Sequence, residues 1–142
     1  MPSSQTHIPV FGSMNPTLEY KTRPAAYALI TDQEGRIAAV KGKGRHFLPG
    51  GGSLPGETPE QTVKREVKEE FARDVQIVRR IGEAIQYFFA EGQHYRMEAV
   101  FFEARFAGEA TDAGEHELYW LDSDEIAVAF YHQCHTWAAG LL

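Results

Sequence analysis

The stretch LPGGGSLPGETPEQTVKREVKEE, residues 48–70, decides the fold of this 142-residue chain. It passes from a glycine-rich loop into a segment that contains neither glycine nor proline after Pro59. Thr58 can cap a helix there, Pro59 suits its first position, and Gln61 completes a capping box. These signals predict a helix over residues 58–71.

One side of this helix carries an apolar stripe. At about 100° per residue, Val63, Val67 and Phe71 fall on one face, which is expected to pack on a core. Glu66 and Glu70 border the same stripe instead of the solvated side. A carboxylate that loses water costs several kcal/mol unless it is paired or bound to a metal ion, so this placement needs an explanation.

Glu66, Glu69 and Glu70 are spaced so that their side chains converge. Three converging carboxylates repel one another and suit a hard divalent cation with oxygen ligands. Arg65 lies four residues before Glu69 and within plausible reach of Glu57, so we interpret it as an orienting group. Taken alone, the run REVKEE is more typical of a solvated helix face. The apolar stripe and the preceding glycines weaken that alternative.

The spacing of these residues resembles the box of the Nudix (MutT-like) hydrolase family. The matching pattern is Gly51-x5-Glu57-x7-Arg65-Glu66-Val67-x-Glu69-Glu70. Arg23-Pro24-Ala25-Ala26 and the segment at 120–126 are also similar to many members. The resemblance implies an α/β fold, the Nudix α/β/α sandwich with a central mixed β-sheet. We expect residues 1–22 to form an N-terminal arm and residues 23–142 to form the Nudix hydrolase domain.

The resemblance also implies the chemistry. A metal-dependent hydrolase would cleave the pyrophosphate bond of a nucleoside diphosphate linked to another group and release a nucleoside monophosphate or similar product. The metal ion, Mg²⁺ or Mn²⁺, would be held by Glu66, Glu69, Glu70 and the carbonyl of Gly50, with Gly51 and Glu57 as structural parts of the box and Arg65 as an orienting residue. Glu66, Glu69 or Glu115 would be the general base, with Glu117 as the competing choice in that loop. The alternative is a nucleotide-sensing domain that binds without cleavage, but such domains typically lose box glutamates and none is lost here.

The box departs from the family pattern at its end. Ala72 stands where the family has a glycine that ends the helix in a left-handed conformation. Alanine adopts that conformation at a cost of about 1 kcal/mol. The helix is therefore expected to run on or to end differently, without loss of a catalytic atom.

Basic and aromatic residues near the box are candidates for substrate binding. Lys43 and Arg45, with Lys41, could meet phosphates, although an exposed basic hairpin end explains them equally well. Phe47 is our candidate for stacking on a base. Tyr27, Tyr87 and Tyr95 are further candidates, but aromatic residues on strands, Phe47 included, are more often core.

A second cluster, His132-Gln133-Cys134-His135, invites a zinc interpretation. It lacks a fourth ligand and the paired spacing of zinc sites, so we do not favour zinc there. Cys134 as a nucleophile is weaker still, because no activating context is visible.

The flanking sequence predicts strands on both sides of the helix. We expect a short edge strand near 18–22, a hairpin of strands at 25–31 and 36–41, strands at 75–81, 85–90, 95–106 and 118–121, and one helix over 126–142.

Composition limits the setting and the partners. Net charge is −6, which disfavours bulk nucleic-acid binding and leaves a small-molecule nucleotide substrate. One cysteine, no signal peptide and no long apolar run predict a cytoplasmic protein without membrane contact, and a homodimer stays open.

Overall fold

A computed structural model describes residues 7–42, 44–108, 114 and 116–142. Its larger sheet has five strands in the order β1-β6-β7-β2-β5, and a smaller sheet has the order β4-β3-β8. β1–β6 and β7–β2 pair in parallel, whereas β6–β7 and β2–β5 are antiparallel, so the central sheet is mixed as predicted. The strands are β1 (Val10–Phe11), β2 (Lys21–Ile30), β3 (Ile37–Gly42), β4 (Arg45–Phe47), β5 (Gly50–Gly52), β6 (Asp74–Ala90), β7 (Gln93–Ala107) and β8 (Tyr119–Leu121).

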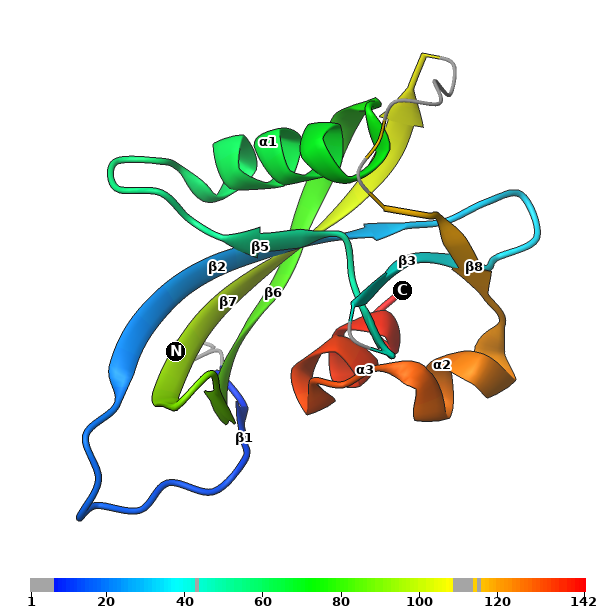
Figure 1. Ribbon diagram of the computed structural model, residues 1–142. Coiled ribbons are helices and arrows are strands. Elements are labelled where there is room, and N and C mark those ends of the chain that lie inside the picture. The colour runs from blue at the N-terminus through cyan, green and yellow to red at the C-terminus, as the bar shows by residue number, and fades with distance from the viewer. Residues whose placement is uncertain (1–6, 43, 109–113, 115) are drawn as a thin grey trace, which may run out of the picture.

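Helices cover both faces of the sheet. Helix α1 (Pro59–Phe71) lies on one side, and α2 (Ser123–Ala129) and α3 (Gln133–Ala139) lie on the other (Figure 1). The protein has two hydrophobic cores, one on each face of the sheet, and β2 contributes to both because successive side chains of a strand point to opposite faces. Ala26, Ala28 and Ile30 pack in the cluster that includes the α1 stripe, and Ala25, Tyr27 and Leu29 pack in the cluster that includes α3. The predicted α/β/α sandwich is confirmed.

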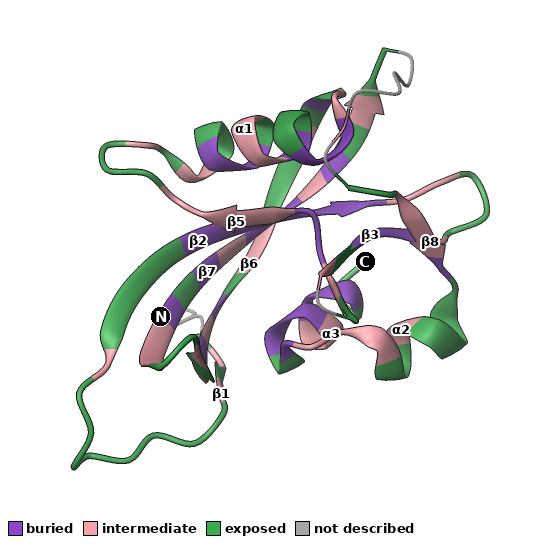
Figure 2. Ribbon diagram, viewed as in Figure 1, coloured by how far each residue is buried: buried purple, intermediate pink, exposed green. Residues whose placement is uncertain are grey.

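Helix α1 begins as predicted. The Thr58 side chain accepts a hydrogen bond from the Gln61 backbone, and the Gln61 side chain accepts one from the Thr58 backbone, so the capping box is complete. Val63, Val67 and Phe71 are buried, and the inward face of α1 in Figure 2 is coloured accordingly.

The end of α1 corrects one expectation. The helix stops at Phe71, and Ala72 takes the left-handed conformation (φ 54°, ψ 35°) with its N–H bonded to the carbonyl of Lys68. The helix therefore does not run on. Alanine occupies the conformation usually taken by glycine because the chain must turn here into β6, which begins at Asp74.

Several predicted boundaries are wrong. Within the described residues, strand pairing between the β2 and β3 segments is limited to the bridge between Thr31 and Ile37, because β5 and β7 occupy both edges of β2. The two strands expected at 75–81 and 85–90 are one strand, β6, whose register shifts near Val78 and Ile81 absorb the irregularity.

The ends of the chain also differ from expectation. Lys21 and Thr22 start β2 and do not form a separate edge strand, and the arm contributes β1 instead. The single C-terminal helix is two helices. Phe130 is extended and the Tyr131 N–H bonds to the carbonyl of His46, which turns the chain between α2 and α3.

Candidate active site

Two glycines of β5 bring the backbone close to its neighbours. Gly50 has φ 135°, and a Cβ there would lie 2.2 Å from the carbonyl oxygen of Ala26. A Cβ on Gly51 would lie 2.9 Å from Oε1 of Glu66. Gly50 therefore allows β5 to pair closely with β2, and Gly51 leaves the space that the Glu66 carboxylate occupies.

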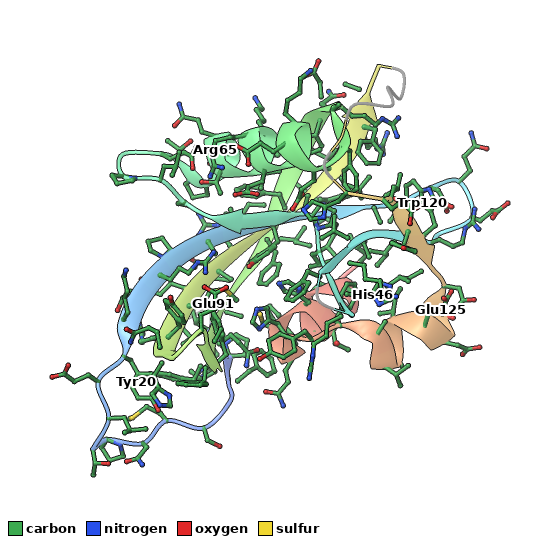
Figure 3. The ribbon with its side chains drawn as sticks, in the orientation of Figure 1. Tyr20, His46, Arg65, Glu91, Trp120 and Glu125 are labelled. Atoms are coloured by element: carbon green, nitrogen blue, oxygen red, sulfur yellow. The ribbon has the colours of Figure 1, made fainter. Side chains whose placement is uncertain are left out.

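Arg65 connects the loop to the helix. Its Nε donates to Oε2 of Glu57 at 2.7 Å, and Nη2 donates to Oε1 of Glu57 at 3.1 Å and to the carbonyl of Gly52 at 3.0 Å. Its Nη1 donates to Glu66 at 3.0 Å and to Glu69 at 3.3 Å. In Figure 3, Arg65 lies between α1 and the loop that follows β5. The guanidinium thus donates hydrogen bonds to four groups at once, three carboxylates and one backbone carbonyl. A lysine ammonium lacks the planar fork of donors that this requires.

The ion pair changes the acidity of Glu57. Its hydrogen bonds from Arg65, followed by those from the Leu54 backbone and Thr62, lower the pKa of Glu57 to about 2. Glu57 is therefore ionised throughout the neutral range and is fully engaged by the protein. That engagement fits the predicted structural role of Glu57 and leaves it unsuited to accept a proton.

The three helix glutamates differ in their surroundings. Glu70 is buried, and its Oε1 accepts a hydrogen bond from the Gly50 N–H at 3.1 Å. Glu66 is half-buried, and burial raises its pKa although the charge of Arg65 opposes the shift. Glu69 is exposed, with about half of its side chain accessible at 47%. The helical wheel thus placed Glu66 and Glu70 correctly at the border of the apolar stripe.

The carboxylates do not form a ready-made cation cage. Among the residues described, no three acidic, histidine or cysteine side chains lie close enough together to hold a metal ion. Glu69 points to Arg65, and Glu70 bonds to the Gly50 backbone. Glu66 shares the Nη1 donor of Arg65 with Glu69, so each of the three carboxylates is held by a hydrogen-bond donor of the protein.

A cavity of about 760 Å³ opens beside this cluster, within the range typical of small-molecule sites. Glu70, Gly50 and Gly51 contribute to its wall, as do the predicted substrate residues Arg45 and Phe47. Lys41 also lines it. The structure therefore brings part of the box and part of the basic segment to one cavity.

The other predicted residues are either outside the described part of the chain or can be placed relative to the cavity. Lys43 and Glu115 are outside the described residues. Glu117 is exposed, accepts a hydrogen bond from the Tyr119 hydroxyl at 2.7 Å, and is not among the described residues of the cavity wall. Tyr87 and Tyr95 are likewise absent from the described wall, whereas Tyr27 lines it but is buried in the core.

Several wall residues were not anticipated. Arg23 lies against Gly52, where an added Cβ would be 2.8 Å from its Nε. Arg23 belongs to β2, and its segment indicated only a family resemblance, so a place for Arg23 at the cavity was not predicted. No sequence signal indicated that the cavity wall would include Phe88, Tyr131 and His116, because their segments come close to the box only in the tertiary fold.

The HQCH segment is mostly core. Cys134 and His135 are buried, and burial raises the pKa of Cys134 to about 12. Nδ1 of His135 accepts a hydrogen bond from the Leu48 N–H at 3.1 Å, so it is an acceptor for the backbone of the box loop.

Comparison with known proteins identifies what this arrangement resembles. A family model described as NUDIX domain matches residues 21–138. The MutT NUDIX hydrolase from Burkholderia pseudomallei is 25% identical with a TM-score of 0.67, over 86% of this chain and 98% of that one. The MutT protein from Methanosarcina mazei Go1 is 22% identical with a TM-score of 0.67, over 87% and 94% of the two chains.

A third structure is that of a NUDIX hydrolase from Nitrosomonas europaea. It is 18% identical with a TM-score of 0.70, over 84% of this chain and 87% of that one. No curated protein matches the sequence. Within the described residues, none of the helices combines the length and apolar character needed to cross a bilayer.

Proposed function

Since the chain belongs to the NUDIX family and is a Nudix hydrolase, we propose that it cleaves the pyrophosphate bond of a nucleoside diphosphate linked to another group, using a divalent cation. The observation that carries the proposal is the position of Arg65. It bonds Glu57, the Gly52 carbonyl and Glu66 at once, and so fixes the box loop against the helix beside the cavity.

The residues present fit a hard divalent ion. Glu66 and Glu70 offer carboxylate oxygens from half-buried and buried positions, and the Gly51 backbone leaves the space in which the Glu66 carboxylate lies. Glu69 is exposed and bonds Arg65 at 3.3 Å, so it can reorient at little cost. With the Gly50 carbonyl, these residues would hold Mg²⁺ or Mn²⁺. When bound, the ion would offset phosphate charge and polarise phosphorus.

The protein would supply orientation and proton transfer. Water adds to one phosphorus, the bridging P–O bond breaks, and the water proton passes to a carboxylate oxygen of Glu66 or Glu69, with Glu115 as the third candidate. The other phosphate leaves as the second product. Arg65 does not touch the substrate in this account. It keeps the carboxylates in place while their charge changes.

Cations of the cavity wall suit the phosphates. Arg23, Lys41 and Arg45 are exposed and line the cavity, in a chain whose net charge is −6. Local positive charge of this kind raises the concentration of an anionic ligand at the site despite the acidic surface. We therefore propose that Arg23 binds the substrate together with Arg45, Lys43 and Phe47.

The test is product release from a panel of nucleoside triphosphates, dinucleoside polyphosphates and nucleotide sugars, with and without Mg²⁺. We expect a nucleoside monophosphate or similar product only with the metal. Glu69→Gln and Glu70→Gln should abolish turnover while circular dichroism shows an unchanged fold. Lys68→Gln, on the exposed side of α1, is the matched control and should keep full activity.

Two outcomes would overturn this assignment. Full activity in both glutamine variants would reject the mechanism. Nucleotide binding without any product after long incubation would instead favour the nucleotide-sensing alternative.

A further inference from the structure

The backbone segment 48–50 of the box loop is held by hydrogen bonds from three different elements. Its first N–H donates to Nδ1 of His135 in α3 at 3.1 Å, its middle carbonyl accepts from the N–H of Ala28 in β2 at 2.8 Å, and its last N–H donates to Glu70 in α1 at 3.1 Å. Because α1 and α3 lie on opposite faces of the larger sheet (Figure 1), the segment is fixed from both helical layers and from the sheet between them.

The N–H of Leu48 takes its hydrogen-bond acceptor from His135. Leu48 is fully buried and lies in the gap between the end of β4 at Phe47 and the start of β5 at Gly50, outside the strand pairings of the described residues. A buried N–H that has no acceptor costs free energy comparable to a lost hydrogen bond. Nδ1 of His135 removes that cost.

The same bond determines where the proton of the His135 ring lies. Nδ1 accepts a hydrogen bond, so it carries no proton, and the ring proton is on Nε2. The side chain is fully buried, which lowers its pKa well below 6.5 and keeps the ring neutral. The ring centre lies 4.3 Å from that of Tyr27 in an edge-on contact. Nε2 is buried and has no hydrogen-bond partner among the described residues.

A phenylalanine at position 135 would fill the same place with little change in stability. It would leave the Leu48 N–H without an acceptor, but it would also remove the buried N–H of Nε2. One unsatisfied donor replaces another, so the two costs nearly cancel. Stability therefore does not explain why this core ring is a histidine. The property that the histidine adds is a backbone that is fixed at Leu48.

Leu48 is adjacent to the parts of the box that the proposed function uses. Pro49, whose ring restricts the backbone, connects it to Gly50, whose carbonyl is a proposed cation ligand. Gly51 follows and leaves the space for the Glu66 carboxylate. A shift of the backbone at Leu48 is therefore passed on to both the carbonyl and the carboxylate.

We infer that His135 is a positioning residue of the box: through its bond to Leu48 it fixes the backbone at 48–50 and so sets where the Gly50 carbonyl lies. His135 is not among the described residues of the cavity wall, so it acts through the backbone and not as a substrate ligand. The inference rests on the proposed function for the role of Gly50. It adds that a core histidine of α3 controls the geometry of the cation site.

The test combines amide hydrogen exchange, followed by nuclear magnetic resonance, with steady-state kinetics. The exchange rate of the Leu48 amide is divided by that of Phe101, a buried residue of β7, so that changes in global stability cancel. In His135→Phe we expect this ratio to rise about tenfold, because the Leu48 N–H loses its acceptor. We also expect kcat to fall about tenfold, because a displaced backbone misplaces groups of the site, while KM changes by less than about twofold.

His135→Asn separates positioning from stability. The asparagine side-chain oxygen, like Nδ1 of histidine, is bonded to Cγ, so it can accept the Leu48 N–H. The smaller side chain leaves a cavity, so this variant should melt at a lower temperature than His135→Phe. Its exchange ratio and kcat should nevertheless lie closer to those of the wild type. The order of the two variants in activity is thus opposite to their order in stability.

Cys134→Ala is the matched control. Cys134 is the preceding residue of α3 and is buried in the same core, so its truncation should lower the melting temperature but leave the exchange ratio and kcat unchanged. An unchanged kcat or exchange ratio in His135→Phe, no rescue by His135→Asn, or an equal loss of kcat in Cys134→Ala would overturn the inference while leaving the proposed hydrolysis intact.

A wild type that cleaves no nucleotide would mean that the proposed function fails. The exchange data then decide the positioning role by themselves. A faster relative exchange at both Leu48 and Gly50 in His135→Phe would support it, since the Gly50 N–H bonds Glu70 and not His135. Faster exchange at Leu48 alone would overturn it.

Discussion

The backbone of Gly51 lies so close to the side chain of Glu66 that a Cβ at Gly51 would be 2.9 Å from Oε1 of Glu66. Any side chain at position 51 would therefore collide with the Glu66 carboxylate. The glycine of the box therefore has a steric role in addition to any conformational one. Its φ is not in the positive region, unlike that of the neighbouring Gly50.

Gly51→Ala should displace the Glu66 carboxylate and lower kcat/KM by about 100-fold, because misplacement of a site group by about 1 Å has effects of that size. Stability should change little, because the atom that must move is the end of a side chain. Steady-state kinetics and thermal melts measure the two effects. Gly140→Ala, which follows α3 at φ −75°, is the control and should alter neither. Wild-type kinetics in Gly51→Ala would refute the steric role.

Arg65→Lys should cost at least about tenfold in kcat, equivalent to about 1.4 kcal/mol. Lysine keeps the charge but cannot bond Glu57, Gly52 and Glu66 simultaneously from one plane. The comparison is with Lys68→Gln, which removes an exposed pair with Asp74 at 3.2 Å and should be neutral. Equal kcat values for Arg65→Lys and the wild type would show that charge alone suffices.

Ala72→Gly should stabilise the fold by about 1 kcal/mol, because glycine adopts the observed φ of 54° without the penalty that alanine carries. For a chain of this size the melting temperature should rise by roughly 3 °C. Calorimetry measures the shift, and activity should stay the same. A lower melting temperature would mean that the methyl group of Ala72 contributes packing that outweighs the backbone strain.

Stability should fall as the pH is lowered from about 6.5 towards 4. Burial lowers the pKa of His132 to about 4 and that of His135 well below 6.5. In that interval the unfolded chain binds protons that the folded chain does not, so acid favours unfolding, by up to about 1.4 kcal/mol per pH unit for each histidine. Urea unfolding at pH 7, 6 and 5 measures the slope. His132→Phe should have a shallower slope than the wild type, and an identical slope would contradict the assignment.

Local signals in the sequence predicted the box well. The cap at Thr58, the stripe through Val63 and Val67, and the bordering Glu66 all depend on residues within a few turns of one helix, so periodicity was sufficient. The pairing of β2 was not predictable in this way. β2 pairs with β7 on one edge and with β5 on the other, and these pairings depend on the tertiary arrangement of the whole sheet.

The cavity wall shows the same limit. Phe88 and His132 are 44 positions apart in the chain, yet their ring centres lie 4.7 Å apart. Nothing in either segment alone indicates this contact. His132 drew attention only as a candidate zinc ligand, because a short histidine–cysteine cluster is visible in sequence and an aromatic wall is not.

The central claim is that the carboxylates of Glu66, Glu69 and Glu70 gather around one divalent cation. Titration with Mn²⁺, with the free ion followed by electron paramagnetic resonance, tests it directly on the wild type and on Glu66→Gln, Glu69→Gln and Glu70→Gln. We predict that the wild type binds Mn²⁺ and that each substitution weakens binding by at least about tenfold, since a hard cation depends on its charged oxygen ligands. Equal affinity in all four proteins, or no binding by the wild type, would contradict the claim.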